Sequence, residues 1–586
     1  MSDPRTLLTT RLAAALDAAF GPEVAGTDPA VRRSDRTDYQ ANVAMALAKR
    51  LKKSPRDVAQ AIAARLDVAG ICDKVEIAGP GFLNLTLDAR FLARETGALA
   101  AEGRERLGDR HLDRLGIAPA DTPETIVIDY SAPNVAKEMH VGHLRSTIIG
   151  DALARMLELL GHRVIRQNHV GDWGTPFGML IEHLLEIGDD PAARADATSD
   201  LTAFYKAARS KFDADPAFAD RARRRVVSMP GGDAPTLALW RTIVDASRRY
   251  FASVYDKLGV TLTDADVCGE SFFNSKLAGV VDELSARGLA VESEGALCIF
   301  LDGWTGKDGQ PVPLIVRKQD GGYGYATTDL AAVRYRTATL GATCLLYVVG
   351  SPQQQHLAMV FEAAKRAGWL APPAHAEHVA FGSVLGADKK MFKTRSGDTV
   401  RLVELIDEAI ERADAVVRQK NPELDDATRA DVARKVGVGA IKYADLSSDR
   451  IKDYVFDWDR MLAFEGNTAP YLMYAHARIR SIFRRGEATL GDSALALDHP
   501  AERALALELV SLPTAVHAAA QTREPHRLCT YLFQLASTFT TFYESCPVLK
   551  ADGAAQRESR LLLCDLTARV LARGLGLLGI EAPDRM

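Results

Sequence analysis

The feature that most constrains this chain is a pair of histidines, His140 and His143, placed where a predicted strand passes into a predicted helix. The apolar run at residues 126–128 is typical of a buried strand, and the residues after the pair repeat apolar side chains with helical spacing as far as Gly161. A helix N-terminus favours anions, because its free backbone N–H groups and its dipole both attract negative charge. Gly142 leaves the backbone between the histidines bare, so a phosphate group could lie close against it.

An isolated His-x-Gly-His is a short pattern, and a capped helix with two surface histidines is its simpler interpretation. The flanking residues favour a binding site instead. Residues 131–144, SAPNVAKEMHVGHL, resemble the HIGH element of class I aminoacyl-tRNA synthetases. The wider run 131–150, together with NHVGDWG at 168–174, is similar to the arginyl-tRNA synthetase form of that element.

Bulk composition sets limits on the class of protein. A chain of 586 residues exceeds one ordinary core, so we expect two to four domains. A net charge of −5 means that any RNA contact must come from local basic patches. The seven cysteines show no CxxC spacing, which argues against a zinc knuckle or a redox pair and favours a cytoplasmic protein with reduced thiols. Neither a secretory leader nor a stretch long enough to cross a membrane is expected.

The order of helical and strand patterns predicts a multidomain α/β protein with three parts. Residues 1–118 read as a small α+β domain, and residues 119–450 as a Rossmann-like parallel-sheet catalytic domain with a helical insert at about 191–258. Residues 451–586 read as an α-helical bundle, because strand signals vanish after residue 453. Predicted strands of the middle part lie at 164–165, 344–349 and 378–381, and predicted helices of the last part lie at 471–485, 501–520 and 559–578.

The resemblance implies how the phosphate side of the site is built. His140 and His143 would donate hydrogen bonds to ATP phosphates, with Gly142 lining the nucleotide. A second basic segment at 390–400, KMFKTRSGDTV, resembles the mobile phosphate-binding loop of the class, although alone it would read as a basic surface turn. The alignment of this segment with the family's loop is ambiguous, so the resemblance does not say how the catalytic positive charge is divided among Lys137, Lys393 and Arg395. It also implies that Lys393 and Thr394 contact ATP.

A second constellation suits a planar cation. Tyr325 and Asp329 are four residues apart, so one helical turn would place them on the same face. The segment 324–332 resembles the arginine pocket of the family, which implies that Asp329 binds the guanidinium group and that Tyr325 packs on it or hydrogen-bonds to it. The alternative is that Thr328 or Asp329 merely caps a helix. The resemblance adds further arginine contacts, with Asp129 and Asn134 at the α-amino end: Asp129, Ser131, Asn134 and Gln353.

Aromatic residues alternate with arginines at 468–485, a combination that can stack bases and hold phosphates. A helix with an aromatic core face and a solvated basic face is the alternative. The segment resembles the start of the family's anticodon-binding domain, and the N-terminal part resembles the domain that touches the outer corner of the tRNA. The ending also matches, so we expect a full-length chain. The tRNA contacts expected from the resemblance are Tyr471, Tyr474, Arg478, Arg480 and Met586.

Taken as a whole, the resemblance implies an arginine–tRNA ligase that uses L-arginine, ATP with Mg²⁺ and the arginine tRNA. We expect a monomer with no membrane contact, no dedicated protein metal site, and no bound zinc or organic cofactor. A synthetase for another amino acid is one rival, and the acidic Asp329 beside the amide of Asn134 argues against it. A non-catalytic RNA-binding relative is the other, and the intact histidine pair argues against that.

Overall fold

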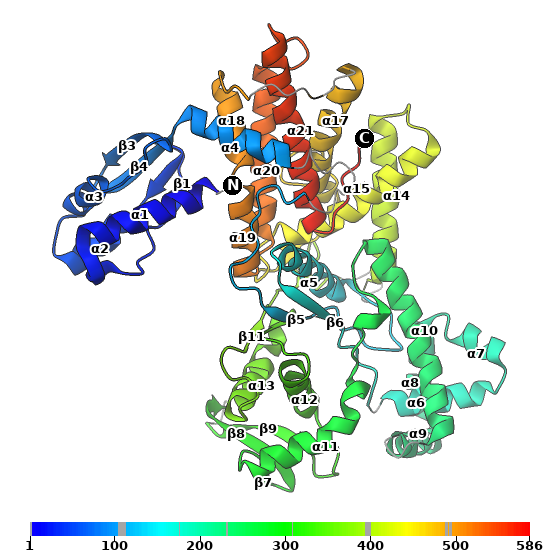
Figure 1. The fold of residues 1–586 in the computed structure, drawn as a ribbon. Helices are drawn as coiled ribbons and strands as arrows, with labels where there is room; N and C mark the ends of the chain where they lie inside the picture. The colour runs from blue at the N-terminus through cyan, green and yellow to red at the C-terminus, as the bar shows by residue number, and fades with distance from the viewer. Residues whose placement is uncertain are drawn as a thin grey trace. The chain divides into compact units, whose positions relative to one another are not determined.

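The computed structural model describes residues 3–102, 113–174, 176–229, 233–306, 309–392, 400–486, 490 and 495–586. The chain forms two compact units, each assembled from segments far apart in sequence (Figure 1). The first unit combines Met1–Pro119 with Ala463–Leu577 and Glu581–Met586, and the second combines Ala120–Leu462 with Leu578–Ile580. The helical C-terminal segment therefore belongs to the same unit as the N-terminal domain.

The N-terminal part of the first unit is the α+β domain expected from the sequence. Its sheet is antiparallel, with the strand order β1-β2-β4-β3. Side chains of β4 alternate between half-buried and buried, as the period-two pattern requires when a sheet covers a core with one face. Its elements are α1 (Pro4–Phe20), β1 (Val31–Arg33), β2 (Tyr39–Ala41), α2 (Val43–Leu51), α3 (Pro55–Ala63), β3 (Cys72–Ala78), β4 (Phe82–Leu87) and α4 (Ala89–Glu102).

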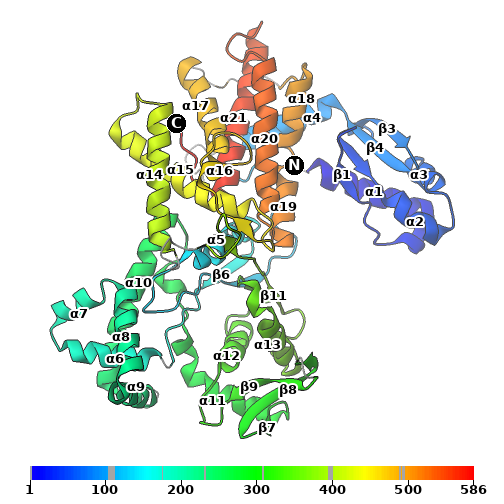
Figure 2. The ribbon, with the colours of Figure 1, turned by 180° about the vertical axis from the view of Figure 1, so that it is seen from behind.

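The C-terminal part of the first unit is helical. The helix predicted at 501–520 is in fact two, because the chain turns at Ser511 and Pro513 begins a new helix, where its missing N–H costs nothing. Helix α4 packs against α18 and α21, which joins the two parts of this unit (Figure 2). The helices are α17 (Ala469–Gly486), α18 (Pro500–Leu509), α19 (Leu512–Thr522), α20 (His526–Ser545) and α21 (Ala554–Leu577).

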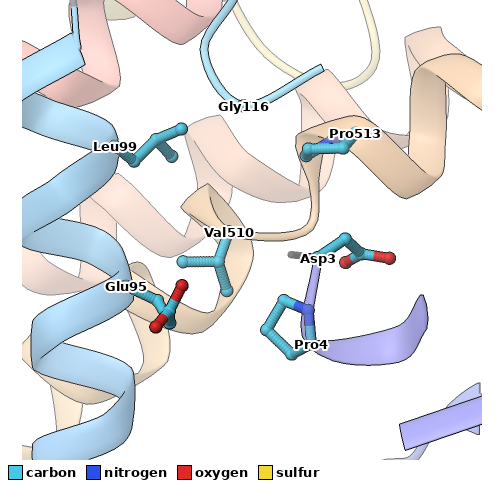
Figure 3. Close-up of a pocket in the computed structure, with 7 residues that line it drawn as sticks. All are labelled: Asp3, Pro4, Glu95, Leu99, Gly116, Val510 and Pro513. Carbon is cyan, nitrogen blue, oxygen red and sulfur yellow. The ribbon is translucent and has the colours of Figure 1, made fainter. Parts of the chain in front are cut away.

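A pocket lies in the first unit where the start of α1 meets α4 and the turn between α18 and α19 (Figure 3). The hydroxyl of Thr514 donates to the carboxylate of Asp3 at 2.6 Å beside it. None of the residues predicted for the active site lines this pocket, which is formed by Asp3, Pro4, Glu95, Leu99, Gly116, Val510 and Pro513.

The second unit is built on a four-stranded parallel sheet with the order β11-β10-β5-β6. The strand order reverses at β5: the chain adds β6 on one side of β5 and later adds β10 and β11 on the other side. Ligands of such sheets bind at the carboxyl ends of the strands beside the reversal. The predicted Rossmann-like sheet is thus present. Its strands are β5 (Thr125–Asp129), β6 (Arg163–Gln167), β10 (Cys344–Tyr347) and β11 (His375–His378).

Helices begin at the carboxyl edge of this sheet. Helix α5 (Val141–Leu159) follows β5, and α13 (Gln354–Arg366) follows β10 through the short η4 (Ser351–Gln353). Helices α11 (Glu270–Ala286) and α12 (Tyr325–Ala338) share one apolar core with α13 and β10. The edge therefore receives the N-terminal turns of several helices, where polar side chains can meet.

A small antiparallel sheet, not expected from the sequence, packs on α11 and α12 with its buried face. Its strands are β7 (Val291–Ser293), β8 (Ala296–Thr305) and β9 (Pro311–Arg317). Strand signals also continue past residue 453, contrary to expectation, because β13 (Tyr454–Val455) pairs in parallel with β12 (Val384–Leu385). The helical C-terminal part therefore starts only after this pair and after the short α16 (Trp458–Met461), which still belongs to the second unit.

The helical insert gathers on one side of the sheet in both ribbon views (Figures 1 and 2). Four of its helices begin after an aspartate whose carboxylate accepts an N–H of the first turn, and three of these carry proline in the first turn, so the sequence itself marks their starts. The helices within the predicted bounds of 191–258 are α7 (Pro191–Ala197), α8 (Leu201–Ala214), α9 (Pro216–Ser228) and α10 (Ala234–Leu258), and α6 (Pro176–Ile187), which precedes them, packs against α8 and α9. Helices α14 (Leu402–Lys420) and α15 (Asp426–Leu446) then pack against each other and on α5. Across the part of the chain that is described, no helix combines the length and apolarity needed to cross a bilayer.

Candidate active site

The histidine pair forms the first turn of α5. The Nδ1 atom of His140 accepts the N–H of Gly142 at 3.0 Å, and Nδ1 of His143 accepts the N–H of His140 at 3.1 Å. The capping interpretation therefore holds, but it uses only one nitrogen of each ring. With Nδ1 as the acceptor, the proton of a neutral imidazole lies on Nε2, which can then donate to a ligand.

Both imidazoles are kept neutral. Burial, together with His140 beside it at a ring-centroid distance of 4.0 Å, lowers the pKa of His143 to about 3. Burial also lowers the pKa of His140, and the charge of Lys137 adds to this effect. At neutral pH the pair thus offers two uncharged N–H donors at a helix N-terminus, which suits the oxygens of a phosphate.

The turn between β5 and α5 is strained and is held by side chains from elsewhere in the unit. Ser131, Ala132 and Ala136 have φ angles of 73°, 47° and 60°, which residues other than glycine rarely adopt. The N–H of Ala132 donates to Oδ1 of Asn168, and the N–H of Ala136 donates to Oγ of Ser247 on α10, each at 2.9 Å. Strain of this kind persists where surroundings impose it and is concentrated at functional sites.

Helix α10 of the insert holds this turn a second time through Tyr255. The Tyr255 hydroxyl lies 2.8 Å from Oγ of Ser131 and accepts Nδ2 of Asn168 at 2.9 Å. Burial raises the pKa of Tyr255 to about 12, so the hydroxyl stays protonated. Thr147 also donates to Oγ of Ser131 at 2.9 Å. Ser131, predicted to bind arginine, is therefore fully engaged with protein partners.

Asn134 lies beside the GDWG segment. It forms a parallel bridge with Gly171, and a β-carbon at position 171 would collide with Oδ1 of Asn134, so a larger residue there would displace the Asn134 side chain. The next residue, Asp172, accepts the N–H and the hydroxyl of Ser271 at 2.8 and 2.6 Å, and its carbonyl accepts Nε1 of Trp240 at 2.8 Å. The segment is thus fixed between the start of α11 and the insert helix α10.

An acidic cluster lies at the starts of α11 and α12. Asp329 accepts a hydrogen bond from Nε2 of His356 at 2.6 Å, and this bond raises the pKa of His356. Burial, followed by the charges of Asp172 and Asp329, raises the pKa of Glu270 to about 7. The carboxylates of Asp172, Glu270 and Asp329 act on one another electrostatically, and only Asp329 is paired with a histidine, so the cluster suits a cationic ligand.

Helix α12 begins at Tyr325 after the N-cap Gly324, so Asp329 lies in its second turn and the capping alternative is excluded for Thr328 and Asp329. Tyr325 is 78% exposed, and Gln353, at the end of η4, is also exposed. The sequence reasoning missed Glu270. An acidic residue in a first helical turn is common for its effect on the helix dipole alone, so the sequence offered no separate signal.

Asp129 is engaged at the edge of the sheet. It accepts Nη2 of Arg336 at 2.7 Å, and Nε of Arg336 donates to Gln167 at 2.6 Å. The Arg336 guanidinium also lies 4.9 Å from the ring centroid of Tyr347. Asp129, Gln167 and Tyr347 end three adjacent strands, so one buried cation ties the edge together. The assignment of Asp129 to the substrate amino group stays a prediction.

Tyr347 connects the two halves of the site. Its hydroxyl is buried and has no hydrogen-bond partner among the described residues. Burial raises the pKa of Tyr347 to about 12, and the charges of both Asp129 and Asp329 contribute to the rise. Asp129 at the end of β5, which leads into the histidine turn, and Asp329 on α12 therefore both act electrostatically on one side chain.

Lys393, Thr394 and Arg395 lie outside the described residues, so their predicted roles stay predictions. The described residues on either side of this segment each contact another part of the second unit. Phe392 stacks on Phe456 with centroids 4.7 Å apart. On the far side, the carbonyl of Val400 accepts the N–H of Val141, the first residue of α5, at 3.1 Å. Val400, the first described residue after this segment, therefore lies beside the histidine pair.

The first unit contains the residues predicted to contact tRNA. Tyr474 is 46% exposed, whereas Tyr471 packs near Phe533. The Arg478 guanidinium lies 4.0 Å from the ring centroid of Tyr543, and Arg480 pairs with Asp584 at 3.3 Å. Met586 is half-buried. The core-face interpretation thus holds for Tyr471, whereas Tyr474 is exposed and Arg478 and Arg480 are half-buried against protein partners.

The fold and the histidine site define a class I aminoacyl-tRNA synthetase: residues 113–458 match the family "tRNA synthetases class I (R), catalytic domain". Residues 6–87 match "Arginyl tRNA synthetase N terminal domain", and residues 472–586 match "DALR anticodon binding domain". The chain belongs to the arginyl-tRNA synthetase family.

Relatives match over the full length. The chain is 59% identical to the arginine–tRNA ligase of Thermobifida fusca over 100% of both chains, and 53% identical to that of Frankia casuarinae over 98% and 97%. Among solved structures it is similar to the arginyl-tRNA synthetase of Plasmodium falciparum, with a TM-score of 0.84 and 28% identity over 100% of both chains. The Thermus thermophilus arginyl-tRNA synthetase gives 0.81 and 27%, over 99% and 100%.

Proposed function

We propose that this enzyme activates L-arginine with ATP and transfers the arginyl group to the terminal adenosine of the arginine tRNA, releasing pyrophosphate and AMP. The observation that carries the proposal is the pairing of two chemically opposite sites at one sheet edge. Neutral N–H donors at the start of α5 suit phosphate, and the carboxylates at the starts of α11 and α12 suit a guanidinium group. The names of the full-length relatives support the same conclusion.

Activation needs positioning more than covalent chemistry. The carboxylate of arginine attacks the α-phosphorus of ATP, and it has no proton to lose, so no general base is required. Nε2 of His140 and of His143 would donate to the phosphate oxygens on which charge changes in the transition state. Because both rings are already neutral and oriented by their Nδ1 hydrogen bonds, little reorganisation would accompany the reaction.

Recognition of arginine would rest on Asp329 and Glu270, with Tyr325 packing against the guanidinium and with Asn134 and Gln353 near the backbone end. A carboxylate offers two parallel acceptors to a guanidinium fork, which lysine cannot match. Lysine would leave buried acceptors unpaired, at about 1–3 kcal/mol for each group. For Asp129 and Ser131, whose polar atoms have buried protein partners, the proposal is that they hold the shape of the site.

The remaining partners follow from the family. ATP is a substrate, and Mg²⁺ would arrive bound to its phosphates. Binding of tRNA would use the C-terminal helices through Tyr471, Tyr474, Arg478, Arg480 and Met586. The proposal includes a monomer in the cytoplasm, in keeping with seven cysteines that form no disulfide. Sedimentation of the purified chain would show a dimer if the first part is wrong.

Exchange of labelled pyrophosphate into ATP, with each amino acid and with or without arginine tRNA, tests the proposal. Only arginine should drive exchange. The variant Asp329→Asn should raise the KM for arginine by about 30-fold or more, because a charged hydrogen bond is worth about 2–5 kcal/mol at a buried site. Asp302→Asn, an exposed carboxylate on β8, is the matched control and should change little. Exchange driven by another amino acid would reject arginine as the substrate.

A further inference from the structure

We propose that Tyr205, on helix α8 of the insert, is a positioning residue that holds the ammonium group of Lys137 at the phosphate side of the active site. The inference deepens the proposed function and rests on it, because it assumes that Lys137 acts on ATP phosphates. Nothing in the sequence connects these two residues, which lie in different elements of the second unit.

The position of Lys137 places its charge beside the histidine pair. It lies in the turn that leads to His140, and its charge contributes to the lowered pKa of that imidazole. Lys137 is an exposed residue with a long side chain, and fixing such a side chain costs rotamer entropy. A lysine left to itself would therefore spend little time aimed at one phosphate oxygen.

Tyr205 supplies the restraint. The Nζ atom of Lys137 lies 4.4 Å from the centroid of the Tyr205 ring, a distance typical of a cation–π contact. Such contacts stabilise by an amount similar to the rotamer entropy that the lysine would lose. The ring thus offsets the entropy cost of ordering the lysine. Because the ring face does not occupy all three ammonium N–H groups with hydrogen bonds, they stay available to bind an anion.

Helix α8 is itself anchored to the same turn. The hydroxyl of Thr202, one turn before Tyr205 and on the same face, donates to Oε2 of Glu138 at 2.8 Å. Glu138 also pairs with Nε of Arg401 at 2.9 Å, and Arg401 forms a β-bridge with His140. The residue next to Lys137 therefore fixes α8, and α8 in turn fixes the ring over Lys137.

The alternative is that Tyr205 only packs in the insert. In that case the electron density of its ring face would not affect the kinetics. Four variants separate the two roles in arginine-dependent exchange at varied ATP. Tyr205→Phe keeps an electron-rich ring and should stay within about twofold of the native kcat/KM for ATP. Tyr205→Leu should lose about 2–30-fold, the range that corresponds to 0.5–2 kcal/mol, with the KM for arginine unchanged. Lys137→Ala should lose at least as much, and adding Tyr205→Leu to it should cost nothing more.

Two controls guard against misfolding and general effects. Phe212→Leu removes another ring of α8, one that lies beside Arg209 and Arg223, and it should leave kcat/KM for ATP native. Placing 3,4,5-trifluorophenylalanine at position 205 keeps the shape of phenylalanine but reduces the negative potential of its ring face. The kcat/KM for ATP should therefore fall toward that of Tyr205→Leu. This replacement decides the matter even if the leucine variant does not fold.

The outcomes are distinguishable. A native-like Tyr205→Leu variant, a trifluorinated ring equal to phenylalanine, or a further loss when Tyr205→Leu is added to Lys137→Ala would each overturn the inference. A Lys137→Ala variant with native kinetics would instead refute the catalytic role of Lys137 in the proposed function, whatever the behaviour of Tyr205. A graded loss that depends on both the ring face and the lysine supports the proposal.

Discussion

Replacing Arg336 by methionine should destabilise the second unit through the carboxylate it leaves behind. Arg336 is 1% exposed and its partner Asp129 is 6% exposed, so neither group can turn to solvent. Breaking a buried ion pair by removing one partner costs about 3–5 kcal/mol, whereas methionine keeps most of the packing volume. Gln167 also loses the donor to its buried Oε1, and this loss is included in the same estimate.

This energy converts to a measurable shift in melting temperature. A unit of roughly 350 residues unfolds with an entropy of about 0.7 kcal/mol per kelvin, so 3–5 kcal/mol corresponds to about 4–7 °C. All five tryptophans lie in the second unit, at positions 173, 240, 304, 369 and 458, so tryptophan fluorescence reports its unfolding separately from the first unit. The change should therefore be visible in an ordinary thermal scan.

Arg334→Met is the matched control on the same helix. Its side chain is 40% exposed and pairs with Glu283 at the surface, so the loss should stay below about 1 kcal/mol, or near 1 °C. Asp129→Asn should restore about 1–3 kcal/mol when added to Arg336→Met, because it removes the unpaired charge. If Arg336→Met melts within a degree of Arg334→Met, the buried pair does not stabilise the sheet edge as argued.

Two further predictions concern the site. Arginine, a cation, should bind better when Glu270 is ionised; with its pKa raised to about 7 in the free enzyme, the KM for arginine should fall about tenfold between pH 6 and pH 8. Glu270→Gln should remove that dependence, and a variant that keeps the full slope would show that another group titrates. Tyr255→Phe should leave Nδ2 of Asn168 and Oγ of Ser131 short of a buried partner, at about 1–3 kcal/mol. A melt by tryptophan fluorescence together with kcat measures it, and native values in both would mean that α10 does not hold the strained turn.

Local patterns were sufficient for part of the site. The histidine pair is encoded by a strand, a turn and a helix that follow one another, and Tyr325 and Asp329 by a spacing of one helical turn. These features need no knowledge of distant residues. The capping role left open for Asp329 could be excluded only once the start of α12 was known.

Features that depend on distant residues could not be predicted. Arg336 and Asp129 are 207 residues apart, and no local pattern pairs them. Strand β9 carries Pro311 and Pro313, which argue against a strand, and it is tolerated because β9 is an edge strand of its sheet. The positive φ angles at Ala132 and Ala136 run against the preferences of alanine and are imposed by Asn168 and Ser247.

The central claim is that phosphate binds at the start of α5 while the guanidinium binds at Asp329 and Glu270. A crystal structure of the enzyme with a non-hydrolysable analogue of arginyl-adenylate tests it most directly. We predict the phosphate within hydrogen-bond distance of Nε2 of His140 or His143, and the guanidinium paired with Asp329. A guanidinium bound elsewhere, with Asp329 still paired only to His356, would contradict the account.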